Sequence, residues 1–427
     1  MCLFFTGNNA KVIFASQRLT MSLNLSFDNT ANAFEYKTDR QLKKAHFLFS
    51  AMGINWLVQM GTRITPWAIK AGLPVQGIIR TTIFEQFVGG ETLEQTAKVA
   101  DKLEEYNVQV ILDYGVEGGD YGEDEKDHAR DEFIRVINYA ATQQNIPFMS
   151  IKVTGLVRFS LLEKMDAAMH NAPGTLIKRY EKVVSELSAD EKAEWQRVWD
   201  RMMLICTTAA SKNVGVLIDA EETWIQDPVD ALTTLMMDHF NKTKAVVYNT
   251  AQMYRHDRLQ FVKDCFEAAT QRNFILGMKL VRGAYMEKER KRAAEMNYPS
   301  PIQATKENSD RDFNAAVTFC LNNINQIATI VASHNEASNL LAAKILDEKG
   351  LPHNHHHVHF SQLYGMSDNI TFNLAKAGYN VSKYLPFGPI KDVVPYLMRR
   401  AQENSSVSGQ TGRELGLIKK EMKRRGN

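Results

Sequence analysis

The sequence predicts an α/β fold, a distorted, TIM-like (β/α)8 barrel with added helices, and three observations lead to it. Eight short β-branched runs occur between residues 108 and about 404, separated by longer stretches of helical spacing. Strand–helix–strand order is typical of parallel strands joined by crossovers. Eight such units fill about 300 residues, near the size of a closed barrel. No Gly-x-Gly-x-x-Gly or Walker A loop opens a helix, so an open doubly wound sheet is the weaker alternative.

Each expected strand is a short apolar run that leads into a polar residue. In chain order the runs are 108–114, 148–153, 214–219, 245–249, 274–281, 328–332, 357–360 and 380–385. The carboxyl ends of barrel strands meet at one opening, where enzymes of this fold carry their active sites. The residues at or just after these ends are Asp113, Lys152, Asp219, Asn249, Lys279, His334 and Tyr384. So many charges favour an enzyme that surrounds a charged ligand over a purely structural barrel.

The barrel is expected within residues 76–404, and residues 1–75 predict an N-terminal extension with a helical arm. Residues 405–427 form a basic C-terminal tail. Its cations are typical of a solvated helix end, although attraction to anionic lipid is the open alternative.

The segment 156–213, between the second and third strands, is unusually long for a barrel connection. Helical spacing is evident at about 176–188 and 190–212, after a Pro-Gly pair at 173–174. We therefore expect a helical insertion between strands 2 and 3.

Composition excludes several classes of protein. Fifty-one basic and 49 acidic residues give a net charge of +2, which is too small to suggest nucleic-acid binding. The four cysteines are far apart, which argues against a zinc ribbon and favours a reducing compartment. No uninterrupted run of 18 apolar residues occurs, and the segment 45–62 suits a helix that lies on a membrane or on the protein better than a spanning one.

Two further features have plain interpretations that we prefer. The first 27 residues carry Lys11 and Arg18 but no acid, which weakly resembles a transit peptide, whereas a start at Met21 would leave residues 1–20 irrelevant. Five histidines cluster at 353–359, but alternation along a strand sends neighbours to opposite faces. We expect a loop entering the seventh strand there and no metal site.

The last predicted helix, residues 389–404, brings polar side chains onto one face. Pro389 suits a first helical turn, and Tyr396, Arg399, Arg400 and Glu403 follow at spacings of three and four. An adjacent arginine pair near a barrel opening suits a carboxylate, because guanidinium groups bind it bidentately. A surface Arg–Glu pair is the equally open alternative.

Six ordered motifs strongly resemble the proline dehydrogenase family, in its branch of mitochondrial-type monofunctional enzymes. They are SIKVTGL (150–156), VLIDAEE (216–222), MKLVRGAY (278–285), VASHNE (331–336), YLPFGP (384–389) and YLMRRAQEN (396–404). The resemblance runs from about Ile79 to Asn404 and weakens in the insertion. It implies a distorted (β/α)8 barrel that uses FAD to oxidise L-proline to Δ1-pyrroline-5-carboxylate, the first step of proline catabolism, and passes the electrons to a membrane quinone.

The resemblance assigns substrate contacts. It implies that Arg399, Arg400 and Lys152 bind the proline carboxylate. It also implies that Tyr285, Tyr384 and Tyr396 wall the pocket, with Leu280 as an apolar lid. The aromatic residue at position 384 favours proline, and hydroxyproline is the runner-up substrate within the family.

The resemblance also assigns catalytic and cofactor residues. Asp219 would orient Tyr285 or a cationic neighbour, although a structural hydrogen bond at the strand end is an alternative. Lys279 would lie near the N1/N5 edge of the flavin and stabilise its negative charge. Asn249 stands where many relatives carry glutamine against the flavin. Further expected contacts of the cofactor are Ala220, Val281, Arg282, Gly283, Ala284, Ser333, His334 and Glu403. No general base for the amine is evident.

Partners and location follow from the resemblance. A separate pyrroline-5-carboxylate dehydrogenase is expected downstream, and the 45–62 segment and the basic tail suit peripheral membrane association. The expected location is the cytoplasmic face of the inner membrane in a bacterium, or the matrix side of the mitochondrial inner membrane in a eukaryote. Other classes stay open: a Schiff-base lyase that uses Lys152 or Lys279, or an inactive barrel that binds a partner.

Overall fold

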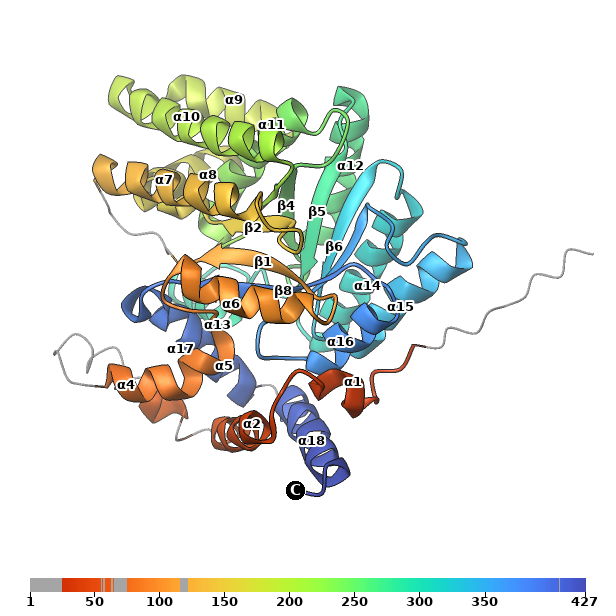
Figure 1. Cartoon of the computed structure of the whole chain (residues 1–427). Coiled ribbons are helices and arrows are strands. Elements are labelled where there is room, and N and C mark those ends of the chain that lie inside the picture. Colours follow the sequence, from red (N-terminus) through yellow and green to blue (C-terminus); the bar gives the residue numbers. More distant parts are fainter. Residues whose placement is uncertain are drawn as a thin grey trace, which may run out of the picture.

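Eight parallel strands close into a barrel, and helices cover its outside (Figure 1). The computed structural model describes residues 25–54, 56, 58–62, 64, 75–115, 122–406 and 408–427. The strands neighbour one another in chain order, and β1 closes the barrel against β8. They are β1 (Gln109–Tyr114), β2 (Phe148–Ile151), β3 (Gly215–Ile218), β4 (Val247–Gln252), β5 (Leu276–Val281), β6 (Ile327–Ala332), β7 (Val358–Leu363) and β8 (Val381–Phe387).

The predicted fold and its eight strands are therefore confirmed, with differences only at the ends. The largest differences concern β4 and β7, which each continue three residues beyond the predicted end. In β4 the added residues include Gln252, whose polar side chain interrupts the apolar pattern by which the strand was predicted. Extended pairing with β5 continues there nevertheless, with Gln252 opposite Val281.

Side-chain alternation divides the barrel into an inner and an outer layer. One buried cluster holds Ile111, Leu217, Tyr248 and Ile330, which fill the interior. Residues one position away along the strands, such as Leu112, belong to the larger core between the strands and the helices. Since successive side chains point to opposite faces of a strand, these clusters show which strand-end residues face the interior.

Apart from the insertion, helices precede β1 (α6), connect consecutive strands (α7 and α11 to α16) or follow β8 (α17). They are α6 (Leu93–Glu104), α7 (Glu123–Ala140), α11 (Gln226–Phe240), α12 (Arg258–Arg272), α13 (Met286–Glu295), α14 (Lys306–Asn322), α15 (Glu336–Glu348), α16 (Asp368–Lys376) and α17 (Ile390–Ser406). Helix α17 begins one residue after Pro389, whose carbonyl accepts the N–H groups of Asp392 and Val393. The proline therefore precedes the helix, whereas the sequence suggested that it lies in the first turn.

The expected helical insertion lies between β2 and β3 and consists of three helices. They are α8 (Phe159–His170), α9 (Leu176–Glu186) and α10 (Ala189–Lys212). The last two match the predicted spans. The Ser188 hydroxyl accepts the backbone N–H of Glu191, and the Glu191 carboxylate accepts the backbone N–H of Ser188. This reciprocal pair is the capping box that starts many helices. The helices α9 and α10 lie beside α11 at one side of the barrel (Figure 1).

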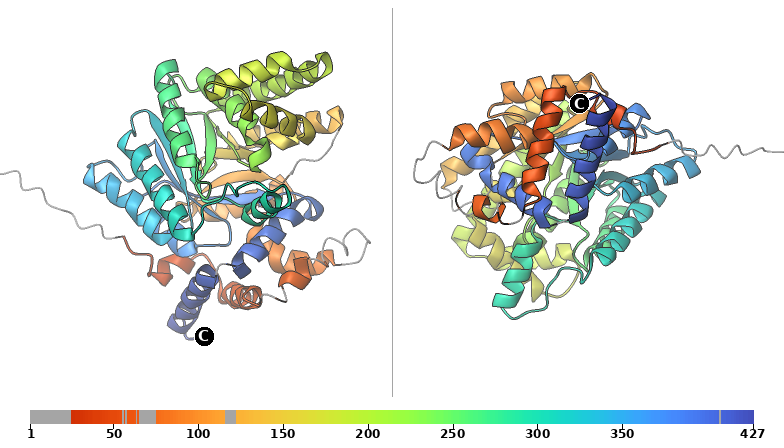
Figure 2. Two further views of the ribbon diagram at one scale, coloured as in Figure 1. Left: turned by 180° about the vertical axis from the view of Figure 1, so that it is seen from behind. Right: turned by 90° about the horizontal axis from the view of Figure 1, so that it is seen from below.

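Short N-terminal helices and the C-terminal helix pack together below the barrel. They are α1 (Thr30–Phe34), α2 (Asp39–Met52), α4 (Gln76–Ile79), η1 (Arg80–Phe84), α5 (Glu85–Phe87) and α18 (Ser408–Arg424). Helix α18 lies alongside α2 (Figure 2, right), and the two share a second buried cluster that includes Leu42, Phe49, Leu417 and Ile418. Most of the basic segment is thus a docked helix. The predictions for residues 1–20 concern positions outside the described residues.

In the described part of the chain, we find no helix with both the length and the apolar character needed to cross a bilayer.

Candidate functional site

Charged side chains gather at the mouth of the barrel, which we define as the opening at the carboxyl ends of the strands. Four of them lie two or four residues after an inward-facing residue of the same strand and so point inward: Asp113, Lys152, Asp219 and Lys279. Tyr384 itself belongs to the inner cluster. Asp219 lies at the centre of these groups. Its Oδ1 accepts a hydrogen bond of 2.6 Å from the Ser150 hydroxyl and pairs with the Lys279 ammonium. Its Oδ2 accepts a 2.7 Å hydrogen bond from the Tyr384 hydroxyl.

Burial and neighbouring charges set the protonation of these groups. Burial raises the pKa of Asp113 to about 6, against the opposing effect of Lys152, whose Nζ is 3.7 Å away. Burial acts in the same direction on Asp219, but the ammonium groups of Lys279 and Lys152 outweigh it and lower the pKa of that carboxyl. Asp219 is therefore ionised at neutral pH. Burial, with both carboxylates nearby, raises the pKa of Tyr384 well above 10, so its phenol stays protonated and donates to Asp219.

The arginine pair lies on α17. Arg400 is 6% exposed, which excludes a fully solvated surface pair. Its guanidinium lies 5.4 Å from the ring centroid of Tyr396, one turn earlier, and the Arg399 guanidinium lies 5.5 Å from that of Tyr285. The second contact joins α17 to the loop after β5. Four residues that the sequence analysis singled out are thus brought together in pairs.

The loop after β5 is held by the side chain of Arg282. Its guanidinium donates to Asp310 and to the Ser333 hydroxyl at 2.7 Å each and to the Ser338 hydroxyl at 3.0 Å, and it stacks on Phe313. Arg282 thereby ties β5 to the loop after β6, which carries Ser333. Any role of Arg282 toward a ligand would come in addition to this structural one.

Gly283 is required by the backbone. Its φ is +130°, and a Cβ atom there would lie 2.4 Å from the ring of Tyr254. Only glycine meets both conditions without strain. The side chains from Val281 to Tyr285 remain half-buried around the mouth.

The loop after β6 also carries His334, whose Nδ1 lies 2.9 Å from the hydroxyl oxygen of Ser367. Burial, together with the nearby cations of Arg400, Lys383 and Arg282, lowers the pKa of His334 to about 3. The imidazole is therefore neutral at physiological pH, with one ring nitrogen as donor and the other as acceptor.

Two expected site residues point away from the mouth. The Asn249 side chain is buried behind β4, where its Nδ2 donates to Asp230 of α11 at 3.1 Å. Leu280 belongs to the core between the barrel and its helices. The reason is the two-residue period of a strand: Tyr248 and Lys279 point inward, so Asn249 and Leu280 point outward. The predictions of a cofactor contact at Asn249 and an apolar lid at Leu280 are therefore corrected.

Sequence reasoning missed Gln252, which faces the mouth. Its Nε2 donates to the carbonyl oxygens of Ala220 and Glu221 at 3.1 Å each, and so fixes the loop after β3. Its Oε1 is buried and has no hydrogen-bond partner among the described residues. The signal was present in the sequence: Gln252 is four residues after Tyr248 and thus on the same face, but the predicted strand ended at Asn249.

The remaining candidates are Glu403 and the histidine cluster at 353–359. The side chain of Glu403 lies outside the described residues. His353, His357 and His359 take ordinary partners, which are Asp347 at 3.0 Å, the Ile324 carbonyl at 2.6 Å and the Ser382 hydroxyl at 2.6 Å. Where the structure describes the chain, no group of three or more His, Cys, Asp or Glu side chains could hold a metal ion.

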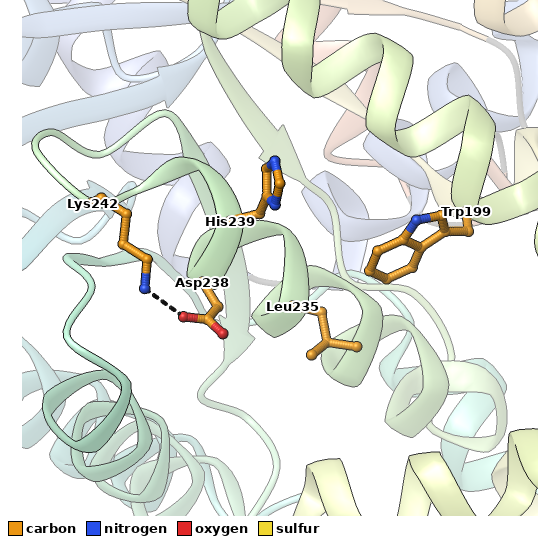
Figure 3. Close-up of a pocket in the computed structure, with 5 residues that line it drawn as sticks. All are labelled: Trp199, Leu235, Asp238, His239 and Lys242. Carbon is orange, nitrogen blue, oxygen red and sulfur yellow. Dashed lines mark hydrogen bonds and ion pairs between the residues drawn. The ribbon is translucent and has the colours of Figure 1, made fainter.

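A surface hollow of about 310 Å³ lies between α10 and α11, and none of the expected site residues lines it (Figure 3). Its lining residues are Trp199, Leu235, Asp238, His239 and Lys242. Asp238 and Lys242 pair with each other at 2.7 Å, so the hollow offers no unpaired charge of these two to a ligand.

Comparisons with known structures agree with this barrel. A crystal structure of proline utilization A (PutA) from Bdellovibrio bacteriovorus, inactivated by N-propargylglycine, matches 88% of this chain with a TM-score of 0.66 and 20% sequence identity. This chain spans only 38% of that protein. At this identity the likeness concerns the fold.

Sequence comparisons identify the family. Residues 96–413 match the family model described as proline dehydrogenase. Proline dehydrogenase 1, mitochondrial, from Dictyostelium discoideum is 30% identical over 93% of this chain and 74% of its own length. Hydroxyproline dehydrogenase from Xenopus laevis is 32% identical over 86% of this chain and 80% of its own length. The chain belongs to the proline dehydrogenase family.

Proposed function

We propose that this protein is an FAD-dependent dehydrogenase that oxidises L-proline to Δ1-pyrroline-5-carboxylate and passes the electrons to a quinone. The observation that carries the proposal is the set of buried charges at the mouth, where Lys152 and Lys279 face two carboxylates and α17 supplies an arginine pair. A compact amino acid with one carboxylate suits such a site, because guanidinium and ammonium groups bind that carboxylate directly.

The substrate would be held at its carboxylate. Arg399, Arg400 and Lys152 are proposed to bind the two oxygens. Cations fixed by burial and by aromatic neighbours hold a ring in one orientation, which favours reaction over free tumbling. Tyr285, Tyr384 and Tyr396 would then wall the ring.

Asp219 is proposed to act as a positioning group. It accepts from the Tyr384 hydroxyl and pairs with Lys279, and so it fixes one wall of the pocket and one cation together. Of the two neighbours that Asp219 could orient, Tyr285 or a cation, this pairing supports the cation.

The residues at the mouth fit a flavin. The buried Oε1 of Gln252 is an acceptor without a partner among the described residues, and the imide N–H of an isoalloxazine ring is a donor that would satisfy it. Lys279 supplies a fixed positive charge, and the loop Val281–Tyr285 remains half-buried. FAD held there would supply the two-electron acceptor for the oxidation of proline at C5. Ala220, Val281, Arg282, Gly283, Ala284, Ser333, His334 and Glu403 remain proposed contacts.

Membrane association is proposed for the exposed apolar residues near the N-terminus of the described chain. Phe47, Trp56 and Ile78 are 66%, 66% and 68% exposed, and Ile54, Met60 and Ile64 are 43–50% exposed. Apolar side chains left in water on one segment are typical of interaction surfaces. A quinone in the membrane as the electron acceptor would explain why these apolar side chains are exposed. The relatives named mitochondrial support a mitochondrial location. We propose the inner membrane within it, with a separate dehydrogenase to oxidise the product.

Residues of the same site bear on two alternative functions. Hydroxyproline is the second candidate substrate, supported by the Xenopus laevis relative, whereas Tyr384 supports proline. A Schiff-base lyase would need a neutral lysine. In this structure Lys279 is engaged in an ion pair with Asp219, which leaves it poorly placed to attack a carbonyl carbon.

Anaerobic reduction tests the proposal. We expect purified full-length protein to show a visible flavin spectrum that is bleached by proline and only slowly, if at all, by hydroxyproline. Faster bleaching by hydroxyproline would reverse the order of the two substrates. A protein with no flavin, or one whose flavin neither compound bleaches, would contradict the proposed function, and trapping by borohydride with a carbonyl compound would support the lyase.

A further inference from the structure

The C-terminal helix reaches the barrel mouth through one short loop, residues 364–367 between β7 and α16. Glu414 of α18 is 5% exposed, and its Oε1 accepts the backbone N–H of Ser367. The family match ends at residue 413. Glu414 itself and the rest of α18 after it therefore lie beyond the matched residues.

Ser367 has an unusual backbone. Its φ of 50° and ψ of 44° place it in the left-handed region, which is unfavourable for residues other than glycine. Such a conformation persists only where the surroundings fix it. The hydrogen bond to Glu414 is one such restraint, and it acts on the same residue whose hydroxyl lies 2.9 Å from His334 Nδ1.

The other side of the loop is fixed as well. Gly365 has a φ of +79°, and a Cβ atom there would lie 1.9 Å from the carbonyl oxygen of Gln86. The Gln86 side chain donates to the Gly365 carbonyl at 2.7 Å. The loop is thus held between α5 and α18, and Gln86 also lies outside the matched residues 96–413.

Buried charges join this contact to the barrel wall. Asp368 pairs with Lys383 of β8 at 2.9 Å and with Lys37 at 3.5 Å, and it accepts a 2.8 Å hydrogen bond from the Tyr36 hydroxyl. Lys383 precedes Tyr384, which faces the mouth. Because buried charges are costly unless they are paired, this network has few alternative arrangements.

We propose that Glu414 is a positioning residue for the cofactor side of the mouth, which acts through Ser367 on His334. The inference rests on the proposed function, in which His334 is a flavin contact. In a neutral imidazole, a fixed hydrogen-bond partner on one ring nitrogen decides whether the other nitrogen is a donor or an acceptor. The Ser367 hydroxyl supplies that partner, and Glu414 holds Ser367 in the conformation that aims it.

The variants Glu414→Ala and Glu414→Gln separate positioning from charge. Burial raises the pKa of Glu414 to about 7, so a neutral acceptor such as glutamine is a close substitute. The exposed Lys419→Ala on the same helix is the matched control. The measurements are the dissociation constant of FAD, from flavin fluorescence on dilution of the full-length protein, and the ¹⁵N signals of the His334 ring, assigned with His334→Asn.

We expect Glu414→Ala to weaken FAD binding about three- to tenfold, the weight of one hydrogen bond, and to shift the His334 signals. Glu414→Gln and Lys419→Ala should stay within about twofold of the parent on the same scale. If Glu414→Ala lowers the melting temperature but leaves the FAD dissociation constant and the His334 signals unchanged, Glu414 only supports α18 and the proposal is wrong.

A second variant covers the case in which Glu414→Ala does not fold. Ser367→Gly tolerates the left-handed backbone but removes the hydroxyl, and we expect it to weaken FAD binding and to shift the His334 signals. Unchanged FAD binding in Ser367→Gly would overturn the proposal. If the parent protein binds no FAD, the proposed function fails, whereas the His334 signals still report whether Glu414 orients that ring.

Discussion

At the scale of single residues, ion pairs decide what the mouth can bind. Asp219 neutralises Lys279, and Asp113 faces Lys152 at 3.7 Å. Two of the buried cations are thus already balanced by carboxylates. An anion that binds at the mouth must therefore compete with these carboxylates for the two lysines.

Replacing either arginine should weaken the binding of proline. We expect Arg400→Ala and Arg399→Ala each to raise KM, since a hydrogen bond to a charged group contributes about 1.5–3 kcal/mol, or roughly 10- to 150-fold. Arg400→Lys should recover only part of the loss, because it keeps the charge but not the guanidinium fork. The exposed Lys391→Ala on the same helix is the control, and an unchanged KM in both arginine variants would exclude the carboxylate clamp.

The raised pKa of Asp113 predicts a pH dependence of ligand binding. Burial holds this pKa at about 6, so near neutral pH Asp113 is mostly ionised and competes with an anion for Lys152. A bound carboxylate raises the pKa further, so binding takes up a proton and affinity falls as pH rises above 6. A five-membered cyclic carboxylate without an amine should show an inhibition constant that rises about three- to tenfold between pH 6 and 8. In Asp113→Asn the profile should be flat, and a flat profile in the parent would contradict this account.

At the scale of elements, the strand β4 shows how alternation assigns roles. Asn249 lies in a buried network with Asp230, which also pairs with Arg258 at 2.7 Å. Gln252 faces the opposite way and spans the carbonyls of the loop after β3. Residues three apart in one strand thus belong to two different systems, one that stabilises the fold and one that forms the site.

This division predicts opposite effects of two substitutions. Asn249→Ala should lower the free energy of unfolding by about 1–3 kcal/mol, because it leaves Asp230 without one donor, yet keep the flavin spectrum. Gln252→Met should change the spectrum and weaken FAD binding with a smaller loss of stability. Denaturant unfolding and flavin titration measure the two effects, and a spectrum altered by Asn249→Ala would restore that residue as a cofactor contact.

At the scale of the whole molecule, the first and last segments that the structure describes contact each other. Arg413 of α18 donates to Asp28 and to Glu336 of α15, and Lys420 donates to the carbonyl of Asp28. Leu417 and Ile418 complete the buried cluster between α2 and α17. The barrel is therefore held from outside by segments that begin and end the described chain.

Shortening one of these side chains should destabilise the molecule measurably. Leu417→Ala removes a fully buried leucine and should cost about 2–5 kcal/mol of unfolding free energy, as large-to-small core substitutions do. Lys419→Ala, two residues away and exposed, should change stability by less than about 0.5 kcal/mol. Equal losses in both variants would mean that α18 does not share the core of the barrel.

Local pattern alone was sufficient for the barrel and for most of its mouth. Apolar runs of strand length and the helical spacing between them depend on neighbours in the chain, so the eight strands and the insertion helices could be predicted. The same holds for Asp113, Lys152, Asp219, Lys279 and Tyr384, because a strand of known phase fixes which side chains point inward. Asn249 and Leu280 differ from the prediction because each is one residue out of phase with an inward-facing neighbour.

Only the tertiary structure decided the pairing of charges and the place of the chain ends. Which carboxylate faces which lysine depends on how far each strand extends and tilts, and a sequence does not record distances between residues 60 or 165 positions apart. Nor does it show that residues 408–424, read as part of a basic tail, bury one face against α2. Burial of that kind arises from long-range packing, which has no local signal beyond an amphipathic helix. The sequence by itself determined a barrel with a charged mouth, and the fold in space decided which of those charges are already paired.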